Sequence, residues 1–292
     1  MRVTEIGGTV ATAADGTRLS VIDRGSGEPF LLIPGLGYAA WSFTRQLGPL
    51  SSVARVLAMD NRGSGHSDKP AGPYSIAQMA DDAFAVLSQR GAIPAHVVGT
   101  SMGGYVALTL ALRHPHAVRS LVLVATTSGG KGSLGVPSET LRIWGKAATS
   151  GVENFARTTM PSAFAPGWVE AHQNEFEELL ALRLSAPTSI DAWRSQFDAC
   201  ATFLRTGLPL QAITQPVTII HGTADRVVPY ENAAHLFRSL PQATVVTLEG
   251  VGHLCWIEQA DAVNTIILNS TGLAEASSSH HLSGVEEWRE RA

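Results

Sequence analysis

The feature that most constrains the fold is a Gly-x-Ser-x-Gly pattern over residues 99–103, set between an apolar β-branched run and an Ala/Leu-rich run. The two runs predict a strand, a sharp turn and a helix. A serine on such a turn adopts strained backbone geometry, so its neighbours two positions away must be small, as both glycines are. The pattern predicts a nucleophilic Ser101 above a sheet, with the backbone N–H of Met102 facing any negative charge that develops there. The alternative is a tight turn in some other α/β protein.

Apolar runs of strand length alternate with runs of helical spacing along most of the chain. Wholly apolar strands are typical of parallel sheets, and the alternation predicts a mostly parallel sheet with helices on both faces. The expected strands span residues 30–33, 53–59, a run ending at 98, 120–125, 217–221 and 244–248, after an antiparallel hairpin over 9–23. The expected helices span residues 41–50, 76–90, 105–113, 232–240 and 260–268.

One long interval, residues 129–214, has helical spacing and many aromatic residues but no strand signal. A structureless loop of that length is improbable in a compact domain. We therefore expect a helical cap of residues 129–214 inserted into an α/β core of residues 1–128 and 215–271. The Ser-rich and charged residues 272–292 predict a polar C-terminal tail, either mobile or a short surface helix. His280-His281 in that tail is an alternative metal-binding pair, but the composition favours an exposed tail.

Composition excludes several classes of function. The chain has 292 residues, 45% of them apolar and 16% charged, which is typical of a globular protein. A net charge of −4 and the lack of a basic run argue against a nucleic-acid partner. No apolar run reaches the roughly 20 residues that a membrane span needs, and no signal peptide is evident. The two cysteines are expected to be reduced, and a cytoplasmic location is expected.

A nucleophilic serine needs a histidine base, and the imidazole needs a carboxylate that orients it. The acid is expected at the carboxyl end of a strand, where parallel sheets present catalytic groups. Asp225 follows the predicted strand 217–221 in this way, whereas Asp60 follows a strand that precedes the serine. His253 lies in a glycine-flanked loop after the next strand. The order Ser101, Asp225, His253 is that of the hydrolases with a nucleophile elbow.

A tetrahedral intermediate also needs hydrogen-bond donors for its oxyanion. The N–H of Met102 is one candidate. The second is the N–H of Leu36, because Gly35 and Gly37 on either side allow the backbone to approach closely.

Together these residues resemble the α/β-hydrolase superfamily, over roughly residues 25–268. The matching pieces are residues 31–37 for the oxyanion loop, 60–67 for the loop after the next strand, 99–103 for the elbow, 221–225 for the acid turn and 252–253 for the base. Serine at the elbow resembles the branch that holds carboxylesterases, enol-lactonases such as 3-oxoadipate enol-lactonase, cofactor-free haloperoxidases and C–C bond hydrolases. Pro34 departs from the pattern, because the family usually has a histidine there that braces the loop.

The resemblance implies hydrolysis of a small carboxylic ester or lactone with an apolar portion, through an acyl-serine. Neither a cofactor nor a metal is indicated. Residues expected to line the substrate pocket are Tyr38, Trp41, Trp144, Trp168, Leu254 and Trp256. Cleavage of a C–C bond, or haloperoxidase or perhydrolase chemistry by the same triad, remains an alternative. A non-catalytic ligand receptor of the same fold is the non-enzymatic one.

Overall fold

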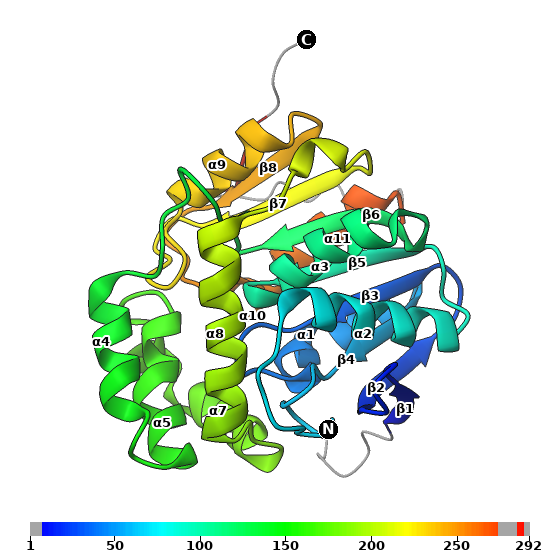
Figure 1. Ribbon diagram of the computed structural model, residues 1–292. Coiled ribbons are helices and arrows are strands. Elements are labelled where there is room, and N and C mark those ends of the chain that lie inside the picture. Colours follow the sequence, from blue (N-terminus) through cyan, green and yellow to red (C-terminus); the bar gives the residue numbers. More distant parts are fainter. Residues whose placement is uncertain (1–7, 274–284, 289–292) are drawn as a thin grey trace.

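The computed structural model describes residues 8–273 and 285–288, and a nine-stranded sheet organises them in the order β1-β2-β4-β3-β5-β6-β7-β8-β9 (Figure 1). Neighbouring strands from β4 to β8 along this order are parallel, and β1, β2 and β9 pair antiparallel at the two ends. The strands are β1 (Thr9–Thr12), β2 (Arg18–Gly25), β3 (Pro29–Ile33), β4 (Arg55–Met59), β5 (Ala95–Thr100), β6 (Val118–Val124), β7 (Val217–Gly222), β8 (Ala243–Leu248) and β9 (Val285–Trp288).

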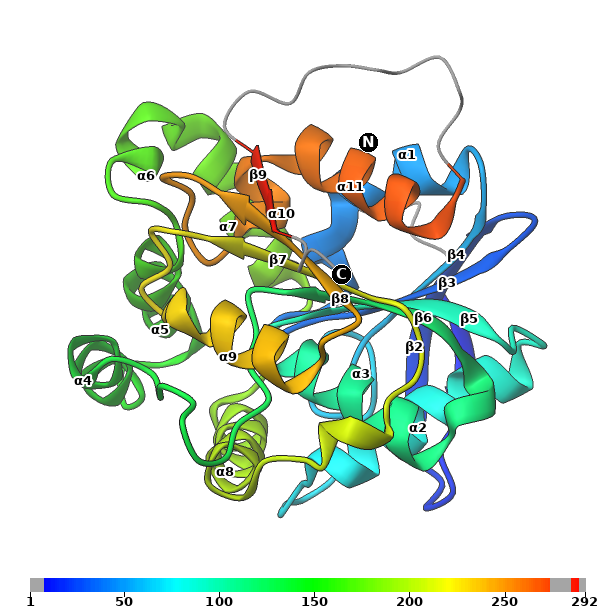
Figure 2. The same cartoon turned by 90° about the horizontal axis from the view of Figure 1, so that it is seen from above.

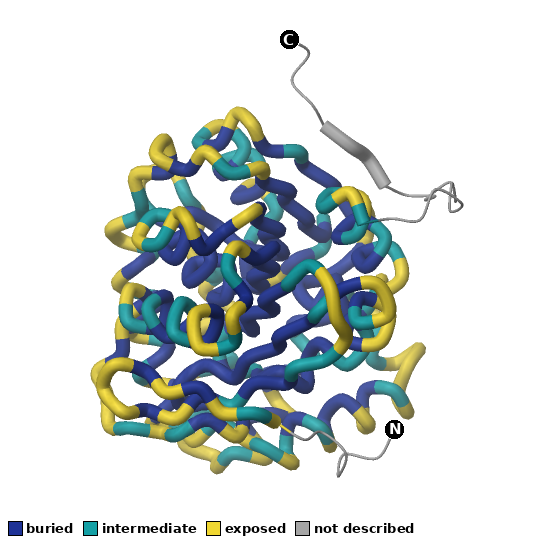
Figure 3. The backbone as a smooth tube through the Cα atoms, turned by 90° about the vertical axis from the view of Figure 1, so that its right-hand side faces the viewer, coloured by how far each residue is buried: buried dark blue, intermediate teal, exposed yellow. Residues whose placement is uncertain are grey.

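Helices cover both faces of this sheet, which confirms the predicted architecture (Figure 2). One face carries α2 (Ile76–Gln89), α3 (Met102–Arg113) and α9 (Glu231–Ser239); the other carries α1 (Thr44–Ser51), α10 (Cys255–Glu258) and α11 (Ala260–Thr271). Successive residues of β3 alternate between two cores: Leu31 packs with α2 and α3, and Leu32 packs with α1 and α11. This double burial explains why β3 is wholly apolar in sequence. The buried backbone lies inside and the exposed segments form the outer surface (Figure 3).

Residues 129–214, the inserted helical segment, connect β6 to β7 and contain helices but no strand (Figure 1). The helices are α4 (Ser138–Ala147), α5 (Val152–Thr159), α6 (Trp168–Ala171), α7 (Gln173–Ser185) and α8 (Ile190–Thr206). The helix expected over residues 41–50 is divided into a 3-10 turn (Ala40–Phe43) and α1. Among the described helices, none has the length and apolar character required to cross a bilayer.

The described part of the C-terminal tail differs from the expectation of a mobile tail or a surface helix. Residues 285–288 form β9, antiparallel to β8. Without β9, β8 would be an edge strand with unpaired backbone N–H and C=O groups, and such an edge pairs with another strand through main-chain hydrogen bonds. The composition of the tail therefore gave no sign of this pairing. His280-His281 lies outside the described residues.

Candidate active site

Ser101 occupies a strained turn between β5 and α3. Its backbone has φ 53° and ψ −120°, in a region that residues other than glycine rarely adopt. The turn also requires close backbone approach on both sides. A Cβ on Gly99 would lie 2.3 Å from the carbonyl oxygen of Gly103, and one on Gly103 would lie 2.0 Å from that of Ile33. Both positions therefore need glycine, and the side chain of Ser101 is held at the carboxyl edge of the sheet.

Asp225 and His253 meet in loops that follow β7 and β8. The Nδ1 atom of His253 lies 2.8 Å from Oδ2 of Asp225. The other carboxylate oxygen accepts hydrogen bonds from the backbone N–H groups of Val227 (2.8 Å) and Val228 (2.9 Å). These bonds fix the carboxylate, which in turn fixes the imidazole and leaves Nε2 as the nitrogen that can exchange a proton with Ser101. His253 and Ser101 line the same cavity.

A second histidine contacts the same carboxylate. Nε2 of the fully buried His221 lies 3.2 Å from Oδ2 of Asp225 and 3.0 Å from the carbonyl oxygen of Val228. Burial raises the pKa of Asp225, but the opposing effects of His253 and His221 outweigh burial and hold the pKa well below its usual range. The carboxylate is therefore ionised at neutral pH, as required of a group that stabilises an imidazolium.

The loop after β3 lies directly against Ser101. A Cβ on Gly35 would be 3.1 Å from the Cβ of Ser101, and both Leu36 and Met102 line the cavity beside it. Met102 is the first residue of α3, so its N–H has no acceptor within the helix. The carbonyl of Pro34 accepts a hydrogen bond from Asn61 Nδ2 at 3.0 Å, which anchors the loop where the usual histidine is missing.

The cavity has a volume of about 300 Å³ and lies between the carboxyl ends of the strands and the inserted helical segment. Of the residues expected to line it, Tyr38, Trp144, Leu254 and Trp256 do so, whereas Trp41 and Trp168 are not among its lining residues. Trp41 stacks behind Tyr38, at 5.3 Å between ring centroids, and Trp168 stacks on Phe164 at 4.2 Å. Within the described residues, no group of three or more His, Cys, Asp or Glu side chains is placed to hold a metal ion.

Sequence reasoning missed a charged residue in this apolar cavity. Arg183 is only 8% exposed, lines the cavity, and has its guanidinium 4.8 Å from the ring centroid of Tyr38. No carboxylate of the described residues lies within ion-pair distance of it. Burial lowers the pKa of its guanidinium, which still stays protonated at neutral pH. The spacing of Phe176, Leu179, Leu180 and Arg183 could have revealed it, because it puts an arginine on the buried face of α7.

Comparison with known proteins shows the family to which this fold belongs. The model of the alpha/beta hydrolase fold family matches residues 28–260, so the chain belongs to the α/β-hydrolase family. A 2-hydroxymuconate semialdehyde hydrolase of Pseudomonas putida is 30% identical, over 94% of this chain and 97% of its own. The enol-lactonase of Burkholderia xenovorans superposes with a TM-score of 0.79 at 26% identity, covering 90% of this chain and 100% of its own. An esterase of a Rhodococcus species gives a TM-score of 0.79 at 25% identity, covering 91% and 99%.

Proposed function

We propose that the chain is a serine hydrolase that cleaves a carboxylic ester or lactone of modest size, with residues 129–214 acting as a cap. The observation that carries this proposal is the 2.8 Å bond between His253 Nδ1 and Asp225 Oδ2 beside the cavity that Ser101 lines. The esterase and enol-lactonase among the structural relatives support it.

In the proposed reaction, Ser101 Oγ attacks the carbonyl carbon while its proton passes to Nε2 of His253. The N–H groups of Leu36 and Met102 hold the resulting oxyanion, and Asp225 stabilises the imidazolium. The tetrahedral intermediate collapses, the C–O bond to the alcohol breaks, and the alcohol takes the proton from His253. A water molecule then attacks the acyl-serine in the same way and releases the acid.

Arg183 favours a substrate with an anionic group and supports a second candidate, hydrolysis of a C–C bond in an oxo acid. A buried guanidinium without a carboxylate partner can bind a substrate carboxylate through charge-assisted hydrogen bonds. The P. putida relative is named as the hydrolase of a 2-hydroxymuconate semialdehyde. Both candidates use the same nucleophile and cavity, and they differ in the bond that breaks.

The experiment compares wild type with Ser101→Ala on p-nitrophenyl esters, lactones and vinylogous diketones, including pairs with and without a carboxylate. Wild type is expected to turn over at least one class, and Ser101→Ala is expected to lose about 10³- to 10⁶-fold in kcat with binding retained. Unchanged turnover in the variant would exclude the mechanism.

Arg183→Met tests whether Arg183 binds an anionic group of the substrate. Arg183→Lys is the control that keeps the positive charge. Removal of the guanidinium is expected to lower kcat/KM for the carboxylate member of each pair by about 10- to 100-fold, with the neutral ester changed far less. An equal loss on both substrates would contradict an anion-binding role.

A further inference from the structure

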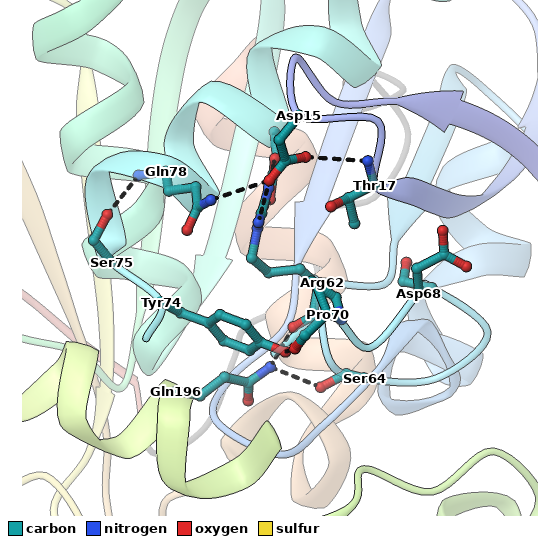
Figure 4. Close-up of polar contacts among 12 residues, drawn as sticks. Asp15, Thr17, Arg62, Ser64, Asp68, Pro70, Tyr74, Ser75, Gln78 and Gln196 are labelled. Carbon is teal, nitrogen blue, oxygen red and sulfur yellow. Dashed lines mark hydrogen bonds and ion pairs between the residues drawn. The ribbon is translucent and has the colours of Figure 1, made fainter. Parts of the chain in front are cut away.

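The side chain of Gln196, on α8 of the inserted helical segment, forms hydrogen bonds with two loops of the core. Its Oε1 accepts a hydrogen bond from the backbone N–H of Gly37 at 2.9 Å. Its Nε2 donates to the carbonyl oxygen of Arg62 at 2.9 Å and to Oγ of Ser64 at 3.0 Å (Figure 4). The residue is fully buried. We propose that Gln196 is a positioning residue that holds the oxyanion loop in its catalytic geometry only while α8 is seated on the core; this inference rests on the function proposed above.

The chemistry of its partners fixes which way the amide points. A backbone N–H can only donate and a backbone carbonyl can only accept, so the oxygen must face Gly37 and the nitrogen must face Arg62. Only an amide of this length supplies both an acceptor and two donors at one place. An apolar side chain of similar size would leave the N–H of Gly37 and the carbonyl of Arg62 buried without partners.

The acceptor acts one peptide unit beyond the proposed oxyanion donor. The N–H of Gly37 and the carbonyl of Leu36 share a planar peptide group, so fixing Gly37 restricts the backbone on the C-terminal side of the Leu36 N–H. Gly37 has φ +71°, and a Cβ there would lie 2.7 Å from Cδ1 of Trp193, one turn earlier on α8. Helix α8 therefore holds this loop both by packing and by a hydrogen bond.

The amide nitrogen of Gln196 bonds to a core loop that is itself held in place by ion pairs of Arg62. The guanidinium of Arg62 is 2% exposed and bonds Asp15 at 2.9 Å (Figure 4). It also bonds Asp82 through two contacts of 2.6 Å. Ser64 Oγ also accepts a hydrogen bond from Thr188 Oγ1 of the inserted segment at 3.0 Å. Gln196 belongs to α8, so lifting α8 from the core would withdraw the acceptor from Gly37. Access to the cavity and the geometry of the oxyanion donors are thereby linked.

The test uses Gln196→Met in the full chain, with Thr188→Val as the matched control. Thr188→Val removes a hydrogen bond between the inserted segment and the same core loop without touching Gly37. With p-nitrophenyl butyrate, Gln196→Met is expected to lower kcat by about 10- to 100-fold with KM within about threefold, and to weaken an alkyl boronic acid inhibitor by a similar factor. Thr188→Val is expected to keep kcat and boronate affinity near wild type.

Equal kcat in the two variants, or a loss confined to KM, would overturn the inference. If Gln196→Met does not fold, Gln196→Glu carries the test, because it keeps an acceptor for the N–H of Gly37 and loses both donors. A kcat within about threefold of wild type at a lowered Tm would support the positioning role, and a kcat that falls in step with Tm would contradict it. A wild-type protein that turns over none of the esters, lactones and diketones tested above and does not bind the boronate would refute the proposed function itself, which is a distinct outcome.

Discussion

The two sides of the candidate site are built from different chemistry. On the histidine side, the functional groups are ionisable side chains: one ring nitrogen of His253 and one of His221 each lie within 3.2 Å of Oδ2 of Asp225. On the oxyanion side, the proposed donors are main-chain amides, and the side chain that fixes their loop is the neutral Gln196. The first side therefore depends on charge and the second on backbone geometry.

Both sides of the site form hydrogen bonds with the inserted helical segment. An ionisable side chain makes these bonds on the histidine side, and a neutral one makes them on the oxyanion side. On the histidine side, Oε1 of Glu258 accepts hydrogen bonds from the N–H groups of Gly252 and Ala165, each at 3.1 Å. Burial raises the pKa of Glu258, and the backbone donors only partly offset this effect. The histidine side thus has a link that titrates, whereas the link through Gln196 does not. A change of pH should affect the two sides differently.

The largest effect is expected from a substitution on the histidine side of the site. Asp225→Asn keeps the size of the side chain but removes the charge that stabilises the imidazolium, and it permits the wrong tautomer of His253. We expect kcat to fall by about 10⁴-fold, the magnitude known for this change in a serine protease. Stopped-flow or steady-state ester kinetics measure it, with circular dichroism as the control for folding. A loss under tenfold would show that the carboxylate is not part of the machinery.

The next largest effect is expected from a substitution on the oxyanion side that removes no charge. Gly37→Ala places a side chain at φ +71° and 2.7 Å from Trp193, so the loop must shift. A displaced donor is expected to lower kcat by about 100-fold, the usual size for one oxyanion-hole donor. The control is Leu36→Ala, which keeps the main-chain N–H and should change kcat by less than about tenfold. If Leu36→Ala is as damaging as Gly37→Ala, the side chain and not the amide is what matters there.

The smallest expected effect is a pH dependence of Tm, which tests whether the link on the histidine side titrates. Because the folded-state pKa of Glu258 is raised above 4.5, its contribution to stability is full below that value and is lost as pH rises through the folded-state pKa. Glu258→Gln has no such titration, so the Tm of wild type should fall relative to this variant as pH rises from about 4.5. The exposed Glu249→Gln serves as the control for loss of a charge. A Tm difference that stays constant from pH 4 to pH 8 would contradict the assignment.

Much of the scaffold could be predicted because its signals are local. An apolar strand, a strained turn and a helix start are each encoded within a few residues. The sequence around Ser101 is therefore enough to predict the strand, the turn and the helix found there. The strands that precede Asp225 and His253 were recognisable for the same reason, and the structure places these two side chains in hydrogen-bond contact.

The cavity and its supports could not be predicted because they depend on distances between segments far apart in the chain. Gln196 lies 159 residues from Gly37, and nothing near either residue indicates that they are bonded. The sequence predicts Trp41 and Trp168 as pocket residues, whereas in the structure they stack on Tyr38 and Phe164 and are not among the residues that line the cavity. Only the packing of whole helices decides which side of an aromatic cluster faces the cavity.

Covalent labelling with a fluorophosphonate tests the central claim most directly, since it asks whether Ser101 is an activated nucleophile. Intact-protein mass spectrometry of the folded wild type should show one probe per chain, and peptide mapping should place that probe on Ser101. His253→Ala should label far more slowly, because the hydroxyl would lose its base. A folded wild type that stays unlabelled, or that carries the probe on another residue, would contradict the account.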